Sequence, residues 1–246
     1  MTGRLITFIV SCYFYFSLFF FSGVLFPVAF LIWLFSLPFD PQLRAAHWFT
    51  CLWSAFILGI NTYWKVRVQG REKIVRGQTY VMMSNHQSAA DILVLFKLFV
   101  PFKWVAKKEL FRVPFIGWNM SLNRYIALER SRGRSKLAMM DRAAEAIRAG
   151  NSVMIFPEGT RTRDGHLQPF KSGGFRLALE TRTPILPIAI SGTFDAIRKG
   201  GFYVHRNDRM KAVVLDPIPY ASFRDLDTGR IAARVHDLIR AELERE

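Results

Sequence analysis

The sequence predicts an α/β fold that is preceded by a hydrophobic N-terminal segment. Beyond residue 65, short apolar runs rich in β-branched residues alternate with helical patterns. Before that point the chain is nearly uncharged, because residues 1–64 contain only Arg4, Arg44 and Asp40 as charged residues. All the others of the 34 basic and 19 acidic residues follow, and the formal net charge is +15. This asymmetry is typical of a membrane segment joined to a basic domain that faces anionic partners.

The N-terminal segment is predicted to form two membrane helices within residues 1–64. No charged residue occurs from Leu5 to Phe39, and a second uncharged run extends from Ala45 to Trp64. A bilayer core needs ~20 apolar residues per helix. Three arrangements remain open: two full spans, a hairpin inserted into one leaflet, or a pair of buried core helices. In both membrane arrangements, the Lys/Arg-rich remainder is expected on the cytoplasmic side.

The remainder, residues 65–246, is predicted to be one catalytic domain without a further boundary. Strand-like runs are found at 65–69, 79–84, 103–107, 124–128, 152–156, 185–190 and 211–216. Helical patterns cover 88–99, 134–149, 173–182 and 228–244. The alternation of the two kinds of element is what predicts the α/β class.

The first candidate motif runs from Asn85 to Asp91, after an apolar strand and at the start of a helix. On an ideal helix a five-residue step does not place His86 and Asp91 on one face. The two side chains can pair only if His86 lies in the turn and folds back over the first helical turn. An aspartate bonded to one ring nitrogen would fix the tautomer and stabilise the protonated imidazole. The alternative is an ordinary capping loop with a solvent-facing histidine.

The second candidate motif contains Glu158, Gly159, Thr160 and Arg161, again directly after a buried strand. α/β proteins place ligand sites at the carboxyl ends of such strands. Gly159 allows a close backbone approach, and the guanidinium fork of Arg161 matches a phosphate group. The alternative is a strand-end turn with a structural Arg–Glu pair.

Basic residues in nearby loops, Lys108 and Arg130 among them, could complete a phosphate pocket or form a solvated basic face. Several other chemistries lose support, because the sequence has no G-x-S-x-G elbow, no H-E-x-x-H or Cys/His cluster, and no phosphate- or dinucleotide-binding glycine loop. Two cysteines in 246 residues also exclude a disulfide scaffold.

Together these residues resemble the membrane glycerolipid acyltransferases over residues 65–215. Four blocks carry the resemblance, in order: His86 and Asp91 match the family's H-x4-D pair; Lys108, Glu109, Leu110, Pro114, Gly117 and Arg130 match its second block; 156–162 match F-P-E-G-T-R-[ST]; and 184–190 match its last block. The resemblance implies a mixed sheet flanked by helices.

The resemblance also implies an activity, the transfer of a fatty acyl group from acyl-CoA or acyl carrier protein to the sn-2 hydroxyl of 1-acyl-glycerol-3-phosphate. The product would be phosphatidic acid, and neither a metal nor a cofactor is implied. His86, oriented by Asp91, would take the proton of the acceptor hydroxyl. The other residues implied for the acceptor site are Arg161, Lys108 and Arg130 for its phosphate, and Glu158, Gly159 and Thr160 for its shape.

Two other functions remain open. One is the same chemistry on another lysolipid, such as lyso-ornithine lipid. The other is a basic, membrane-anchored protein that binds without catalysis, which leaves the His–Asp pair unexplained. We expect a lipid acceptor and a thioester donor as partners, no nucleic acid, and a location at the inner membrane with the domain on the cytoplasmic face.

Overall fold

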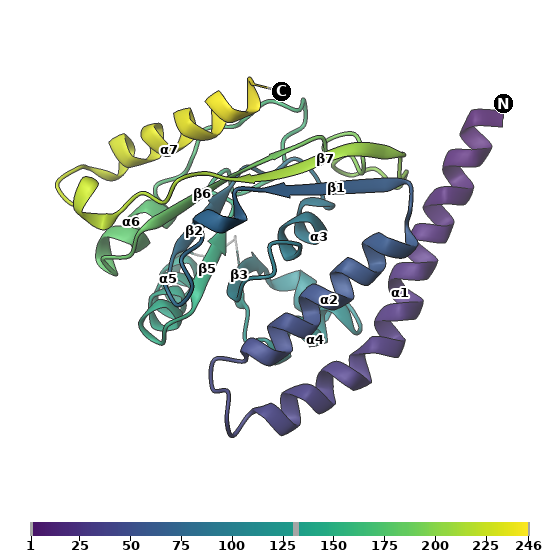
Figure 1. Cartoon of the computed structure of the whole chain (residues 1–246), viewed down its shortest axis with the longest axis horizontal. Coiled ribbons are helices and arrows are strands. Elements are labelled where there is room, and N and C mark those ends of the chain that lie inside the picture. Colours follow the sequence, from purple (N-terminus) through teal and green to yellow (C-terminus); the bar gives the residue numbers. More distant parts are fainter. Residues whose placement is uncertain (1, 130–132, 246) are drawn as a thin grey trace.

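A computed structural model describes residues 2–129 and 133–245 and places a mixed sheet at the centre of the molecule (Figure 1). The strand order in this part of the chain is β1-β7-β6-β2-β5-β3-β4. Strands β2 to β6 are mutually parallel, β7 is antiparallel to β6, and β1 runs parallel to β7. The bounds are β1 Trp64–Gln69, β2 Val81–Ser84, β3 Phe102–Lys107, β4 Ile126–Leu128, β5 Ser152–Ile155, β6 Ile185–Ser191 and β7 Asn207–Val214. The predicted α/β class and mixed sheet are confirmed.

Helices cover both faces of the sheet (Figure 1). Their bounds are α1 Thr2–Ser36, α2 Arg44–Ile60, α3 Asp91–Phe96, α4 Ile116–Leu122, α5 Gly133–Arg148, α6 Gly173–Glu180 and α7 Thr228–Leu243. Successive side chains of a strand point to opposite faces. On β2, Met82 therefore packs in the cluster with α1, α2 and α3, whereas Val81 and Met83 pack in the cluster with α5, α6 and α7.

Two local differences from the predicted elements have physical causes. The helix predicted over 88–99 is confined to Asp91–Phe96, because residues before Asp91 form the turn that carries His86. Helix α4 was not predicted, since its seven residues carry no recognisable hydrophobic period. It packs closely on the 3-10 turn Lys108–Arg112, and a Cβ on Gly117 would collide with the backbone oxygen of Leu110.

The second uncharged run forms a helix that packs on the sheet domain rather than a second helix long enough to span. α2 has 17 residues, and polar side chains on one face find partners in the domain. His47 Nδ1 lies 2.9 Å from Tyr125 Oη, and Ser54 Oγ donates to the Leu93 carbonyl at 3.1 Å. Within the described residues, only Gly3–Ser36 is long and apolar enough to cross a membrane.

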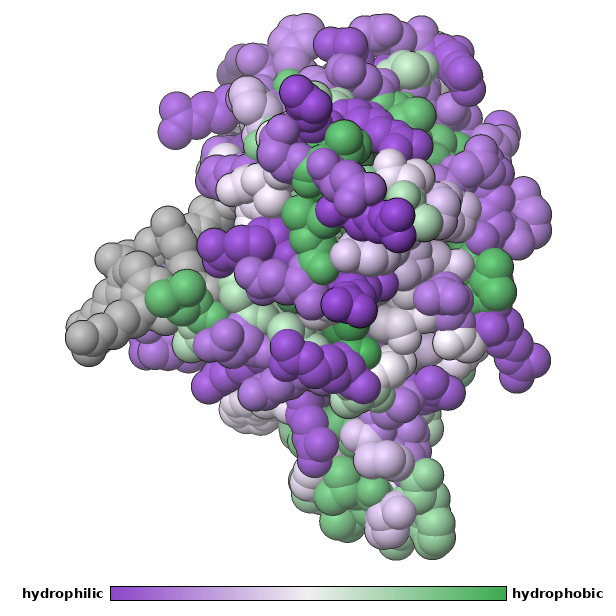
Figure 2. Space-filling model, turned by 90° about the vertical axis from the view of Figure 1, so that its left-hand side faces the viewer, coloured by the Kyte–Doolittle hydropathy of each residue, from purple (hydrophilic) through white to green (hydrophobic). Residues whose placement is uncertain are grey.

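Helix α1 packs on the rest of the molecule along its length and still presents an apolar face outward. Its aromatic side chains meet Trp64, Phe56 and Trp118 at ring-centroid distances of 4.9, 4.9 and 5.5 Å. The outward face exposes Leu5, Ile6, Phe8, Ile9, Phe16, Phe19, Phe20, Val24, Leu31, Leu34 and Phe35. Hydrophobic residues also gather at the lower end of Figure 2, where Figure 1 places the α1–α2 connection. One core cluster contains both Phe14 of α1 and Trp104 of β3, so the hydrophobic core extends across the boundary predicted between residues 64 and 65. That boundary stays a prediction.

A buried lysine fastens the α1–α2 connection to the sheet. The Lys103 ammonium donates to the carbonyls of Gln42 at 2.7 Å and Asn123 at 2.9 Å. Burial lowers the pKa of Lys103 to about 8, and the charge of Asp40 opposes this shift only in part. The connection is thus held by a cation whose loss would leave two carbonyls unpaired.

We therefore expect Lys103→Met to lower the free energy of unfolding by about 2 kcal/mol, because unpaired buried acceptors carry a desolvation cost. Chemical unfolding in detergent, followed by tryptophan fluorescence, measures this loss. Lys107→Met, at the exposed end of the same strand, is the matched control and is expected to stay within about 0.5 kcal/mol of wild type. Equal stability of the two variants would contradict the role given to Lys103.

Candidate active site

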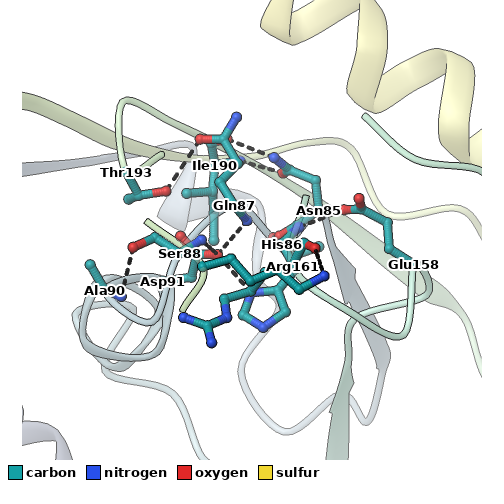
Figure 3. Close-up of polar contacts among 12 residues, drawn as sticks. Asn85, His86, Gln87, Ser88, Ala90, Asp91, Glu158, Arg161, Ile190 and Thr193 are labelled. Carbon is teal, nitrogen blue, oxygen red and sulfur yellow. Dashed lines mark hydrogen bonds and ion pairs between the residues drawn. The ribbon is translucent and has the colours of Figure 1, made fainter. Parts of the chain in front are cut away.

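The two sequence motifs meet at the carboxyl ends of neighbouring parallel strands. The first follows β2 and the second follows β5, and these strands pair in register from Val81 with Val153 onward. The amide of Thr162 donates to the His86 carbonyl at 2.9 Å, which keeps the two loops in contact. Figure 3 shows the resulting group of polar side chains.

His86 and Asp91 form a direct pair. His86 Nδ1 lies 2.7 Å from Asp91 Oδ2, and the carboxylate is fully buried. As the spacing required, His86 lies in the turn and folds back over the start of α3. The same Oδ2 atom accepts the backbone N–H groups of Gln87 at 2.7 Å and Ser88 at 2.9 Å. Asp91, at the first position of α3, thus closes the turn that places His86.

This geometry determines which ring nitrogen can react. An Nδ1–H that donates to the carboxylate leaves the lone pair on Nε2, so Nε2 of His86 is the available base. A carboxylate beside the ring also stabilises the imidazolium that forms when Nε2 takes up a proton. The side chain of His86 is 17% exposed, so the ring is reachable from solvent, whereas Asp91 is not.

An aromatic stack fixes the plane of the imidazole. The ring of His86 lies on that of Phe156 with centroids 3.8 Å apart and planes 8° from parallel. Phe156 in turn stacks on Trp104, on the neighbouring strand β3, at 5.4 Å. This position of Trp104 was not predicted, because nothing in its local pattern shows which strand will lie beside β5.

Asn85 fastens the His86 turn to the other neighbouring strand. Its amide group donates to the Ile190 carbonyl and accepts from the Ile190 N–H, both at 2.7 Å. The side chain is buried, and its two bonds replace a pair of backbone bonds at the end of β6. Asn85 was also missed as a functional residue, although its place between an apolar strand and a histidine was a usable signal.

Glu158 joins the two loops through its carboxylate. Oε1 accepts the backbone N–H of His86 at 2.6 Å, and Oε2 accepts that of Gln168 at 3.1 Å. Burial raises the pKa of Glu158 to about 7, the two N–H groups oppose this rise, and the charge of Asp91 adds to it. Both oxygens of Glu158 are thus engaged by backbone N–H groups of the protein itself.

The raised pKa of Glu158 predicts a pH-dependent stability. Between the ordinary value of 4.5 and about 7, the folded protein keeps a proton that the unfolded chain releases. The free energy of unfolding should therefore fall, by on the order of 1–3 kcal/mol, as the pH rises through this interval. Denaturant titrations at pH 5, 6, 7 and 8 measure the slope. Glu158→Gln should be flatter over the same range, and an equal slope in both proteins would remove Glu158 as its source.

The remaining predicted residues lie at the same edge of the sheet but in different surroundings. Gly159 has φ +72°, and a Cβ there would lie 2.6 Å from Lys171 Nζ. Arg161 is half-buried in the loop after β5, next to the His86 turn (Figure 3), and Thr160 precedes it in the same loop and is also half-buried. Lys108, at the end of β3, pairs with Glu129 at 3.4 Å and is 53% exposed. Arg130 lies outside the described residues.

Within the described part of the chain, no group of three or more His, Cys, Asp or Glu side chains could hold a metal ion.

Comparisons with known proteins give matches to acyltransferases. A family model described as Acyltransferase matches residues 65–191. A chloroplastic 1-acyl-sn-glycerol-3-phosphate acyltransferase of Brassica napus is 37% identical over 194 residues, which cover 78% of this chain and 56% of that protein. A 1-acyl-sn-glycerol-3-phosphate acyltransferase of Pseudomonas aeruginosa is 34% identical over 154 residues, or 62% of this chain and 60% of that protein. The chain spans about half the length of the chloroplastic relatives that it matches.

The fold has a counterpart of known structure. The crystal structure of a 1-acyl-sn-glycerophosphate acyltransferase from Thermotoga maritima superposes with a TM-score of 0.81 and covers 98% of this chain and 96% of that one. The two sequences are 22% identical, so this likeness concerns the fold.

Proposed function

Because the chain belongs to the acyltransferase family, we propose that it transfers a fatty acyl group from a thioester to the sn-2 hydroxyl of 1-acyl-glycerol-3-phosphate. The donor is acyl-CoA or an acylated carrier protein, and the product is phosphatidic acid. The observation that carries the proposal is the His86–Asp91 pair, whose geometry leaves Nε2 free to accept a proton. The names of the matching relatives support the choice of acceptor.

The proposed reaction needs one base and no covalent intermediate on the protein. Nε2 of His86 takes the proton of the acceptor hydroxyl as its oxygen attacks the thioester carbonyl. Asp91 stabilises the imidazolium formed in this step. When the tetrahedral intermediate collapses, the carbon–sulfur bond breaks, the imidazolium returns the proton to the departing thiolate, and a free thiol and an ester result.

We assign the acceptor's phosphate to Arg161, in the loop that Thr162 and Glu158 hold against His86. A guanidinium offers two parallel N–H donors to phosphate oxygens. Lys108, directly after β3, adds positive charge on that side of the site, and we also assign Arg130 to the phosphate. Glu158, Gly159 and Thr160 shape the acceptor site.

Arg161→Met is therefore expected to raise the KM for the lysophospholipid about 10- to 100-fold with a smaller change in kcat, because a charge-assisted bidentate contact is lost. Steady-state thiol release measures both constants. Arg163→Met, two residues on and exposed, is the matched control and should leave KM unchanged. A fall in kcat alone would move Arg161 from acceptor binding to the chemical step.

We place the protein at the inner membrane, with residues 65–246 on the cytoplasmic face. The apolar outward face of α1 supports membrane association, and the net charge of +15 supports attraction to anionic lipid and to an anionic donor. An acyl-transfer rate insensitive to ionic strength would contradict the attraction of the basic domain to anionic lipid and to an anionic donor.

The experiment that tests the function is thiol release from a long-chain acyl thioester, measured with and without lysophosphatidate. We expect release to require lysophosphatidate and phosphatidic acid to appear in equal amount. Parallel reactions with lyso-ornithine lipid and lysophosphatidylcholine test the choice of acceptor. Release only with another lysolipid would keep the chemistry and change the acceptor, whereas no release with any of them would favour a binding protein without catalysis.

A further inference from the structure

The connection between β6 and β7 carries a loop that the proposed acyl transfer leaves without a role. We call residues 198–206 the aromatic loop. Phe202 and Tyr203, at its tip, are 46% and 50% exposed. Single exposed apolar side chains are ordinary on a protein surface, but two adjacent aromatic rings beside an apolar helix form a larger patch.

The aromatic loop continues the apolar face of α1. The ring of Phe202 stacks on Tyr15 with centroids 5.1 Å apart and lies 6.2 Å from Phe8. The N–H of Val204 donates to Ser11 Oγ at 2.8 Å, so the backbone of the loop is fixed to α1 as well. In Figure 1 the ends of β1 and β7 face α1 along one side of the molecule. Phe202 thus packs among apolar side chains of α1, and Tyr203 lies beside Phe202 with ring centroids 5.9 Å apart.

The charges around this patch have one dominant sign. The aromatic loop contains Arg198, Lys199 and Arg206 and no acidic residue. Asp195, just before the loop, pairs with Arg198 at 2.7 Å. Aromatic rings flanked by cations are the composition of segments that lie at a membrane–water interface, because the rings occupy the headgroup level and the cations meet lipid phosphates.

The aromatic loop also contacts the acceptor loop. Lys199 Nζ donates to the backbone carbonyl of Arg161 at 2.8 Å. A loop that rests on lipid would thus be bonded directly to the residue that we assign to the acceptor's phosphate.

We propose that the aromatic loop is a second membrane contact, with Phe202 and Tyr203 in the headgroup region of an anionic bilayer beside α1. The loop and α1 together set the level of Arg161 relative to the lipid phosphates. The partner of this surface is the lipid headgroup layer and not a second protein. The proposal rests on the membrane association of α1 and is independent of the chemistry assigned to His86.

Depth-dependent fluorescence quenching tests this placement in the full-length chain. An environment-sensitive thiol dye is attached to Tyr203→Cys in a Cys12→Ser background, and the protein is reconstituted with phosphatidylglycerol vesicles that carry shallow or deep nitroxide quenchers. Cys51 is buried. Labelling of the Cys12→Ser protein, which has no new cysteine, shows whether Cys51 reacts with the dye. The same dye on the native, exposed Cys12 reports on α1. Ala233→Cys, exposed on α7 in the opposite helical layer, is the reference position.

We expect the dye at position 203 to be quenched at least about twofold more strongly by the shallow quencher than the dye at position 233. Quenching at position 12 but not at position 203 would overturn the proposal while leaving the membrane association of α1 intact. Absence of quenching at both positions would overturn the proposal together with that association. Neither result bears on whether the chain transfers acyl groups.

A kinetic experiment separates a lipid contact from a structural role. The double variant Phe202→Ser/Tyr203→Ser should turn over a vesicle-embedded acceptor about tenfold more slowly, because two interfacial side chains are lost. Its rate on a short-chain acceptor dispersed below its micelle concentration should equal that of wild type. Equal losses on both acceptors, or circular dichroism that differs from wild type, would mean that the aromatic rings stabilise the fold rather than contact lipid.

Discussion

Replacing His86 by alanine is expected to lower the rate of acyl transfer by about 10³-fold or more. A positioned general base contributes 10²–10⁴-fold in rate, and this variant removes Nε2, the nitrogen that the His86–Asp91 pair leaves available as the base. The backbone of residue 86 keeps its bonds to Glu158 and Thr162 in this variant, so the loops should stay in place. Thiol release with saturating acceptor measures the loss.

The matched control for this change is His166→Ala. His166 is exposed in the loop after β5 and uses its backbone N–H, not its ring, to bond Asp164. We expect the activity of His166→Ala to equal that of wild type. The thermal unfolding temperatures of His86→Ala and His166→Ala should both be close to the wild-type value. If His86→Ala retained full activity while folded, the assignment of the base would be wrong, although the family would still stand.

Much of the site could be predicted because its residues follow apolar strands. Parallel strands bring their carboxyl ends to one edge of the sheet, so the turns after residues 84 and 155 had to lie at the same edge once both runs were strands. The requirement that His86 fold back onto Asp91 also followed from the helical period alone. The site's contacts with Trp104 and Ile190 could not be predicted, since they depend on strand order, which no local pattern encodes.

The N-terminal segment also shows that contacts between distant parts of the chain are not predictable from local sequence. Absence of charge predicted two membrane helices, but hydropathy does not distinguish lipid from a protein partner. The signal that α2 packs on the domain lies in His47, Thr50 and Ser54, whose polar groups need partners. Those partners come from α3, α4 and the residues just before β3 and β4, whose positions the sequence does not reveal. α1 also buries polar groups, at Ser11, Ser17 and Ser22, but among the described helices it alone is long and apolar enough to cross a membrane.

Asp91→Asn is expected to lower kcat by about 10²–10³-fold and to leave the KM for the acceptor nearly unchanged. One atom, Oδ2, accepts all three hydrogen bonds of this carboxylate, from His86, Gln87 and Ser88. The single carbonyl oxygen of asparagine can take that position and keep all three. The new NH₂ group then replaces Oδ1, which is buried and accepts no hydrogen bond in the described part of the chain. The variant therefore removes the negative charge while it preserves the turn and the tautomer of His86.

Asp91→Ala is the comparison that separates charge from geometry. It removes the charge together with the three bonds, so we expect a further loss of activity and a decrease of about 2–4 kcal/mol in the free energy of unfolding. The asparagine variant should unfold nearly as wild type, because its hydrogen bonds persist. If asparagine instead kept full kcat, stabilisation of the imidazolium by the carboxylate charge would not contribute to the rate, and Asp91 would act only by holding the ring of His86 in place. A fall in kcat with unchanged stability assigns the effect to that charge, because the geometry is then common to both proteins.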